Sequence, residues 1–188
     1  MKKILIPSII LLISVYIIRL VYINRHTYAP NNLTYKLLDE VKIEEDFFDD
    51  STEDMNGYSV KVINSKILTI DELKENYEGI SINNNCDYVI IVSAEFRNYG
   101  NENGEKSGID LSHYIFQETS YINYFDENIF KKINDFNSPR FCLVQNTERI
   151  FEIPFTISSS QVSINRLKNG TPSLVISLFP NKKSIVLN

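Results

Sequence analysis

The strongest hydrophobic signal in the sequence lies at the start of the chain. Lys2 and Lys3 precede an apolar run from Ile4 to Ile18, and apolar residues resume after Arg19 and continue to Ile23. Twenty residues of α-helix are about 30 Å long, which matches the thickness of the hydrocarbon core of a bilayer. The pattern therefore predicts a transmembrane signal-anchor helix in residues 1–23, with membrane contact through residues 4–23.

A cleaved signal peptide is the alternative interpretation, because it also combines a basic start with a short apolar stretch. Its small-residue cleavage site is missing, since Arg19, Leu20 and Val21 follow the apolar run directly. A buried helix of a soluble protein would be a third interpretation. Because the two lysines favour a cytoplasmic N-terminus, we expect a single-pass cell-membrane protein with its domain on the extracytoplasmic side. If the segment is cleaved, the domain is secreted instead.

Beyond this segment the chain divides into a short polar stretch and one domain. Residues 24–34 are polar and include Pro30, so we expect a stalk there. Residues 35–188 alternate apolar and polar positions over short segments, which is the period of a β-strand with one buried face. A single domain of this length can bury a substantial core.

The clearest predicted strand is Cys86–Arg97, followed late in the chain by a strand with Phe155 and Ile157 that closes the same core. The inward face of the first strand carries Tyr88, Ile90, Val92, Ala94 and Phe96. The other predicted strands are residues 41–48, 58–62, 109–118, 141–144, 149–157, 174–179 and 183–187. A capping box from Thr69 to Glu72 and the apolar spacing of residues 126–134 predict two short helices. Together these elements indicate a mostly β domain, an antiparallel β-sandwich.

The charge of the domain narrows its range of partners. Four of the 19 basic residues precede His26, which leaves 15 basic against 24 acidic residues and a net charge of −9 for the rest of the chain. Contact with nucleic-acid phosphates requires clusters of Lys and Arg, so no nucleic-acid partner is expected. Residues 44–54 hold seven of the acids. They do not form a calcium-binding loop of the EF-hand type, because Met55 stands at the sixth position from Asp50 where that loop needs Gly.

Few residues in the sequence offer chemistry. Ser112 and His113 are adjacent, and on a strand they would point to opposite faces, so we expect no catalytic triad. No Gly-rich phosphate loop and no zinc-ligand spacing occur. We therefore expect no catalytic, cofactor-binding or metal-binding residues, and no cofactor. Cys86 and Cys142 allow either one disulfide bond or two separate buried thiols.

A group of aromatic residues is the one candidate contact surface. Aromatic side chains are enriched in the centres of binding interfaces, although they are also ordinary core residues. The group comprises Tyr114, Phe116, Tyr121, Tyr124 and Phe125. If these side chains are exposed, they form a contact patch, and if they are buried, they belong to the core.

Several segments resemble those of a known group of proteins. They are GYSVKVINSKILTIDEL, CDYVIIVSAEFRN, IDLSHYIFQ, ERIFEIPFTIS and LVISLFPNKKSIVLN, which lie between residues 57 and 188. In this order they resemble bacterial membrane-anchored proteins that carry an extracytoplasmic immunoglobulin-like domain of unknown function. The resemblance implies an immunoglobulin-like antiparallel β-sandwich displayed at the cell surface, and it carries over no catalytic residue.

These observations favour a non-enzymatic function. We expect a membrane-anchored domain that binds a protein or an envelope component. One alternative is an extracytoplasmic enzyme whose site is assembled from scattered carboxylates. Another is a membrane-anchored immunity or sensor protein. The identity of the partner does not follow from the sequence.

Overall fold

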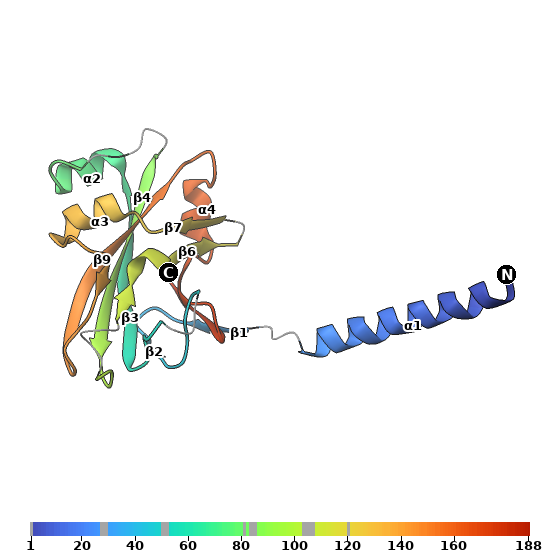
Figure 1. Cartoon of the computed structure of the whole chain (residues 1–188). Helices are drawn as coiled ribbons and strands as arrows, with labels where there is room; N and C mark the ends of the chain where they lie inside the picture. The colour runs from blue at the N-terminus through green and yellow to red at the C-terminus, as the bar shows by residue number, and fades with distance from the viewer. Residues whose placement is uncertain are drawn as a thin grey trace.

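The structure, a computed structural model, describes residues 2–26, 30–49, 53–80, 82, 86–102, 108–119 and 121–188. The chain begins with one long helix, α1 (Lys2–His26), which projects away from a β-rich domain (Figure 1). Within the described residues, no helix is both long enough and apolar enough to cross a membrane. The described side chains of α1, those of residues 11–25, are all exposed.

Two main β-sheets make up the domain. The first has the strand order β1-β11-β10-β6-β7, with bounds Asn31–Tyr35, Asn181–Val186, Ser173–Ser177, Ile115–Glu118 and Tyr121–Tyr124. The second has the order β2-β3-β4-β9, with bounds Glu40–Ile43, Tyr58–Thr69, Tyr88–Asn98 and Glu148–Ile157. The short strands β5 (Ile109–Asp110) and β8 (Arg140–Phe141) pair with each other. Among the described strands, all pairs are antiparallel except β1 with β11, so the prediction of a mostly β, sandwich-like domain is confirmed.

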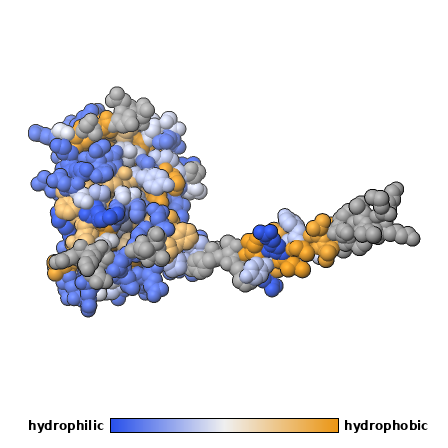
Figure 2. Space-filling view, viewed as in Figure 1, coloured by the Kyte–Doolittle hydropathy of each residue, from blue (hydrophilic) through white to orange (hydrophobic). Residues whose placement is uncertain are grey.

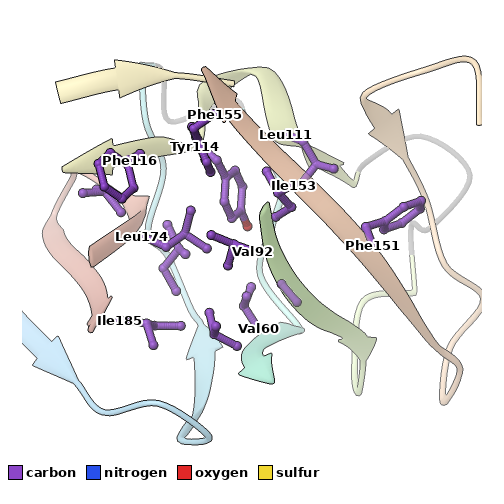
Figure 3. Close-up of a cluster of buried hydrophobic side chains, with 14 of the residues drawn as sticks. Val60, Val92, Leu111, Tyr114, Phe116, Phe151, Ile153, Phe155, Leu174 and Ile185 are labelled. Carbon is purple, nitrogen blue, oxygen red and sulfur yellow. The ribbon is translucent and has the colours of Figure 1, made fainter. Parts of the chain in front are cut away.

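The core lies between the two sheets (Figure 3). Val60, Val92 and Phe155 of the second sheet face Leu174 and Ile185 of the first, and all five are fully buried. On β4, the inward positions predicted from the alternation at residues 90, 92, 94 and 96 are buried as expected, while Tyr88 at the start of the strand is half-buried. Burying a side chain of the size of Leu or Phe stabilises the fold by about 1.5–3 kcal/mol.

Short helices cover the outer face of the second sheet. They are α2 (Ile70–Asn76) and α3 (Glu127–Asn134), whose Leu73 and Ile129 pack with Val89 and Ile91 of β4. The predicted capping box is present, because the Thr69 hydroxyl accepts from the Glu72 amide at 3.3 Å and the Glu72 carboxylate accepts from the Thr69 amide at 2.7 Å. Two further short helices, η1 (Leu111–His113) and α4 (Ile164–Asn169), were not predicted.

The predicted stalk is wrong in its last part. Residues 31–34 belong to β1, which pairs in parallel with β11 from Asn31 opposite Asn181 to Tyr35 opposite Ile185. Four of the five side chains of β1 are exposed, so the strand has no apolar alternation that the sequence could reveal. Its backbone pairing with the last strand holds it in place. The predicted strand over residues 109–118 is likewise divided, because Asp110 caps η1 between β5 and β6.

One buried ion pair joins the two sheets. The ammonium group of Lys183, on β11, lies 2.5 Å from the Asp46 carboxylate, and both side chains are almost completely buried. Lys183 also donates to the main-chain oxygen of Lys42, on β2, at 2.7 Å. The other carboxylate oxygen of Asp46 accepts from the backbone and side-chain N–H groups of Asn181 at 3.2 and 2.9 Å. This network fixes the segment after β2 against β11 of the first sheet.

Removing one partner of this pair is expected to destabilise the domain strongly. Lys183→Met leaves the Asp46 carboxylate buried without its counter-charge, which costs about 3–5 kcal/mol and lowers the melting temperature by roughly 10 °C. The double variant Asp46→Asn, Lys183→Met carries no buried charge and is expected to recover at least half of the loss. Lys182→Met removes the same charge from the neighbouring, partly exposed position and is the control. Thermal denaturation followed by circular dichroism measures all three, and equal effects of Lys182→Met and Lys183→Met would contradict a structural role for the ion pair.

Candidate functional site

The end of the domain where the chain emerges from α1 is rich in acidic residues. The segment after β2 is held there by the turn between β10 and β11. Phe47 donates its amide to the Phe179 carbonyl at 2.5 Å, and its own carbonyl accepts from the amides of Leu178 and Phe179, both at 2.9 Å. The rings of Phe47 and Phe179 stack with centroids 6.0 Å apart. We call residues 44–49 and 53–56, together with Phe179 and Pro180, the acid-rich end.

The acid-rich end contains an open hollow. Its volume is about 440 Å³, and its lining combines four carboxylates with one aromatic ring, one amide side chain and one proline. The lining residues are Glu44, Glu45, Phe47, Glu53, Asp54, Asn56 and Pro180. The buried Lys183 lies near this lining, with its ammonium 3.7 Å from the Glu44 carboxylate. The hollow therefore presents a negative surface with an apolar edge.

The far side of this loop is fixed by two buried asparagines at the end of β4. Asn98 accepts from the amide of Asn101 at 2.8 Å, and Asn101 donates its side-chain N–H to the carbonyl of Asn56 at 2.7 Å. Gly57 has φ +89°, and a Cβ atom there would lie 2.3 Å from the amide nitrogen of Asn101. Only glycine fits both constraints, so the turn into β3 depends on it.

Next to the hollow, a histidine from another part of the chain faces two carboxylates. Nε2 of His113 lies 3.7 Å from the Asp49 carboxylate, and its Nδ1 lies 3.6 Å from the Glu53 carboxylate. One ligand atom from each of the three residues can be chosen so that all lie within 4.8 Å of one another. No pattern in the sequence indicates this group, because Asp49 and Glu53 lie in an irregular loop and His113 lies 60 residues after Glu53 in an unpredicted 3₁₀ turn.

The turn that carries His113 is fixed by Asp110. One oxygen of the Asp110 carboxylate accepts from the amide and hydroxyl of Ser112 at 3.0 and 2.5 Å, and the other pairs with the Arg140 guanidinium at 2.8 Å. Burial acts to raise the pKa of Asp110, but the contacts with Ser112 and Arg140 outweigh it and hold the pKa below its usual value. Ser112 therefore donates its hydrogen bonds to Asp110, while His113 points to the acid-rich end.

The structure divides the candidate aromatic patch, because two of its members belong to the core. Tyr114 and Phe116 are fully buried in the core and cannot contact a partner. Tyr121 and Phe125 are half-buried and pack against the core. Tyr124, on the edge strand β7, is the exposed member of the set. The alternation along β6 decides this outcome, because Phe116 points towards the second sheet, where it lies 5.8 Å from Phe155.

The edge of β9 is another surface that a partner strand could use, but much of it is already occupied. Asn134 of α3 accepts from the amide of Glu152 at 2.8 Å and donates to the carbonyl of the same residue at 2.9 Å. Asp126 donates its amide to the Pro154 carbonyl, and Asn123 donates its side-chain amide to the next carbonyl on that edge, that of Thr156. Since exposed strand edges invite pairing with another chain, these contacts protect the central part of β9 from strand addition.

The two cysteines are free, so the interpretation as a disulfide bond is not supported. Cys86 precedes β4 by two residues, whereas Cys142 lies at the other end of that strand, next to Leu143, whose carbonyl accepts from Asn98. A strand of this length spans about 30 Å at roughly 3.3 Å per residue, while disulfide formation needs Cα atoms within about 7 Å. Burial raises the pKa of both thiols.

Comparison with known proteins identifies the family of the chain. Residues 33–183 match the family described as "Domain of unknown function (DUF5028)". Because the match covers most of the chain, the protein belongs to this family. No curated protein and no solved structure matches the chain.

Because both cysteines are free, their reactivity with a thiol reagent can be predicted. Two free thiols per chain are expected to react with a thiol reagent under non-reducing conditions, and the exposed Cys142 is expected to react before the half-buried Cys86. Labelling of the full-length protein followed by peptide mass spectrometry measures the order, and Cys142→Ser removes the fast phase. A chain that yields no free thiol until it is reduced would contradict this assignment.

Proposed function

We propose that the protein is a membrane-anchored, extracytoplasmic binding domain without enzymatic activity, and that it contacts a positively charged segment of an envelope protein through the acid-rich end. The observation that carries the proposal is the concentration of carboxylates around an aromatic edge at the end of the domain nearest to the anchor.

The exposure of α1 supports the anchor. Its described side chains include Leu12 and Ile18, which are 69% and 68% exposed, and the consecutive apolar residues 15–18 are all exposed and so lie on every side of the helix. Figure 2 shows apolar residues on the face of the helix turned to the viewer. A helix that is apolar on all sides belongs in an apolar environment, and a large exposed apolar surface marks a site of interaction with a protein or a membrane. In the sequence, the apolar run begins at Ile4.

The pairing of β1 supports the position of the contact surface. Four residues separate His26, the last residue of α1, from Asn31, so the two lie within about 18 Å even if the chain between them is fully extended. Asn31 lies opposite Asn181, which follows Pro180 at the hollow. The acid-rich end is therefore the part of the domain closest to α1, where a partner at or near the membrane would meet it.

Charge complementarity supports a cationic partner. The hollow is lined by four carboxylates, and the exposed side chain of Asp49 adds a fifth beside it. A surface with one sign of charge attracts partners of the opposite sign and raises their association rate. The stacked rings of Phe47 and Phe179 offer an apolar platform for the stems of Lys or Arg side chains, which bury readily against aromatic surface.

The immunoglobulin-like subclass stays a prediction. Two sheets packed around one core agree with it. The order β2-β3-β4-β9 differs from the A-B-E-D sheet of immunoglobulin constant domains, because the two central strands β3 and β4 are consecutive in the chain, whereas the central strands B and E are not. The proposed binding function does not depend on this point, because sandwich folds carry many functions.

The anchor is tested by placing a charge in the middle of the apolar run. Leu12→Asp is expected to move the full-length protein from the membrane fraction to the soluble fraction, since a charged residue at the centre of a span costs about 3 kcal/mol on insertion. Val144→Asp places the same charge at an exposed apolar position of the domain and serves as the control. The intact mass of the wild-type protein reports whether residues 1–23 are retained. A soluble wild-type protein or a cleaved N-terminus would contradict the anchor.

The contact surface is tested by neutralising its acids. Fluorescence anisotropy measures binding of a labelled Lys- and Arg-rich peptide to the full-length protein in detergent. Glu44→Gln, Glu45→Gln is expected to weaken binding by about tenfold, which corresponds to roughly 1.4 kcal/mol. Glu75→Gln, Glu78→Gln removes two exposed charges from the α2 end of the domain and is expected to change binding little. Equal losses in both variants would mean that only net charge matters, and turnover of an envelope substrate would overturn the non-enzymatic assignment.

A further inference from the structure

We infer that Asp49, Glu53 and His113 form a site for a divalent transition-metal ion of the zinc type. The inference is independent of the proposed anchor and of the proposed peptide contact. It rests on the types of the three side chains, on their spacing and on the contacts that hold them in place.

The three side chains form a mixed donor set from two separate parts of the fold. One imidazole and two carboxylates converge, and the ligand atoms lie within 4.8 Å of one another. Zinc takes nitrogen and carboxylate oxygen ligands at about 2.0–2.2 Å, so neighbouring ligand atoms of a tetrahedral site lie about 3.3 Å apart. The contacts of His113 at 3.7 Å to Asp49 and 3.6 Å to Glu53 are too long for hydrogen bonds but close to this spacing.

The two carboxylates face different nitrogens of the imidazole ring. A metal ion uses one of these nitrogens, so binding requires a small movement of the ring or of the Asp49 side chain. Asp49 is the most exposed of the three side chains and can make this movement. The unused nitrogen then keeps a carboxylate neighbour, an arrangement that orients metal-binding histidines in many proteins.

Glu53 and His113 are held in position by contacts that need no metal. The Glu53 carboxylate accepts from the backbone amides of Phe48 and Asp49 at 3.0 and 2.9 Å, which closes the loop upon itself. The buried ring of Phe48 lies 5.8 Å from the imidazole and forms the floor beneath it. His113 is part of η1, the turn that the contacts of Asp110 with Ser112 and Arg140 hold in place. Two of the three ligands are therefore preorganised, which reduces the cost of binding.

The surroundings of the three side chains favour a cation. Glu53 also lines the acidic hollow, so the other carboxylates there raise the local concentration of cations.

The donor set also selects the type of ion. Calcium and magnesium prefer oxygen ligands, with six or more positions around the ion. An imidazole with two carboxylates suits zinc and neighbouring first-row metals, and water can take the fourth position. This site differs from the EF-hand calcium loop that the sequence excludes for residues 44–54. Its third ligand, His113, comes from η1 and not from the acidic segment.

The site is tested by titrating the full-length protein in detergent with zinc chloride and measuring binding by isothermal titration calorimetry. One equivalent is expected to bind. His113→Gln and Asp49→Asn each remove one ligand and are expected to weaken binding by at least about tenfold. Glu45→Gln, in the same acidic segment, removes one attracting charge but no ligand and is expected to weaken binding far less than Asp49→Asn, while His26→Gln, the other histidine, is expected to leave the affinity nearly unchanged. Calcium chloride is expected not to compete with zinc.

Three outcomes would overturn the inference. They are the absence of stoichiometric zinc binding, an equal loss of affinity in Glu45→Gln and Asp49→Asn, and full competition by calcium. The last two would mean that the acidic segment attracts cations without forming a site. Because Asp49 is largely exposed, Asp49→Asn keeps the fold, and it decides the question even if His113→Gln lowers the melting temperature.

Discussion

The buried ion pair between Lys183 and Asp46 is the constraint on which the acid-rich end depends. A charge buried in a protein interior is costly unless a partner of opposite sign lies beside it and the remaining polar atoms are satisfied. Lys183 finds the Asp46 carboxylate at 2.5 Å and the carbonyl of Lys42 at 2.7 Å. Asp46 in turn accepts from Asn181. Since these residues come from both sheets, the chain cannot satisfy the pair without bringing β2, β11 and the loop after β2 together.

Once this loop is fixed, the rest of the acid-rich end follows from short contacts. Phe47 is held against the turn between β10 and β11, Phe48 enters the core, and the Glu53 carboxylate caps two amides of the same loop. Carboxylates that would otherwise be scattered on a mobile loop are thereby concentrated around one hollow. One segment of the sequence therefore has two roles. Its Asp46 neutralises the buried Lys183, and its other carboxylates form a surface suited to cations.

The sequence predicted the parts of the fold that depend on local pattern. The alternation along Cys86–Arg97 identified the central strand, and the capping box at Thr69 identified the start of α2. It failed where tertiary contacts decide. β1 is almost entirely exposed and is held by backbone pairing, so it left no apolar pattern, and Tyr114 and Phe116 could not be assigned to the core without knowing the register of β6. The group of Asp49, Glu53 and His113 was missed for the same reason, since its members meet only in the folded chain.

The central claim is that the acid-rich end is the functional surface of the domain. Hydrogen–deuterium exchange on the full-length protein tests it most directly, by comparing the free chain with the chain in the presence of the cationic peptide and, separately, of zinc. The account predicts that protection increases in the segments 44–56 and 110–114, and that the α2 end of the domain, from Leu68 to Tyr77, is unchanged. Protection that is absent from the acid-rich end, or that centres on α2 or on the β7 edge, would contradict it.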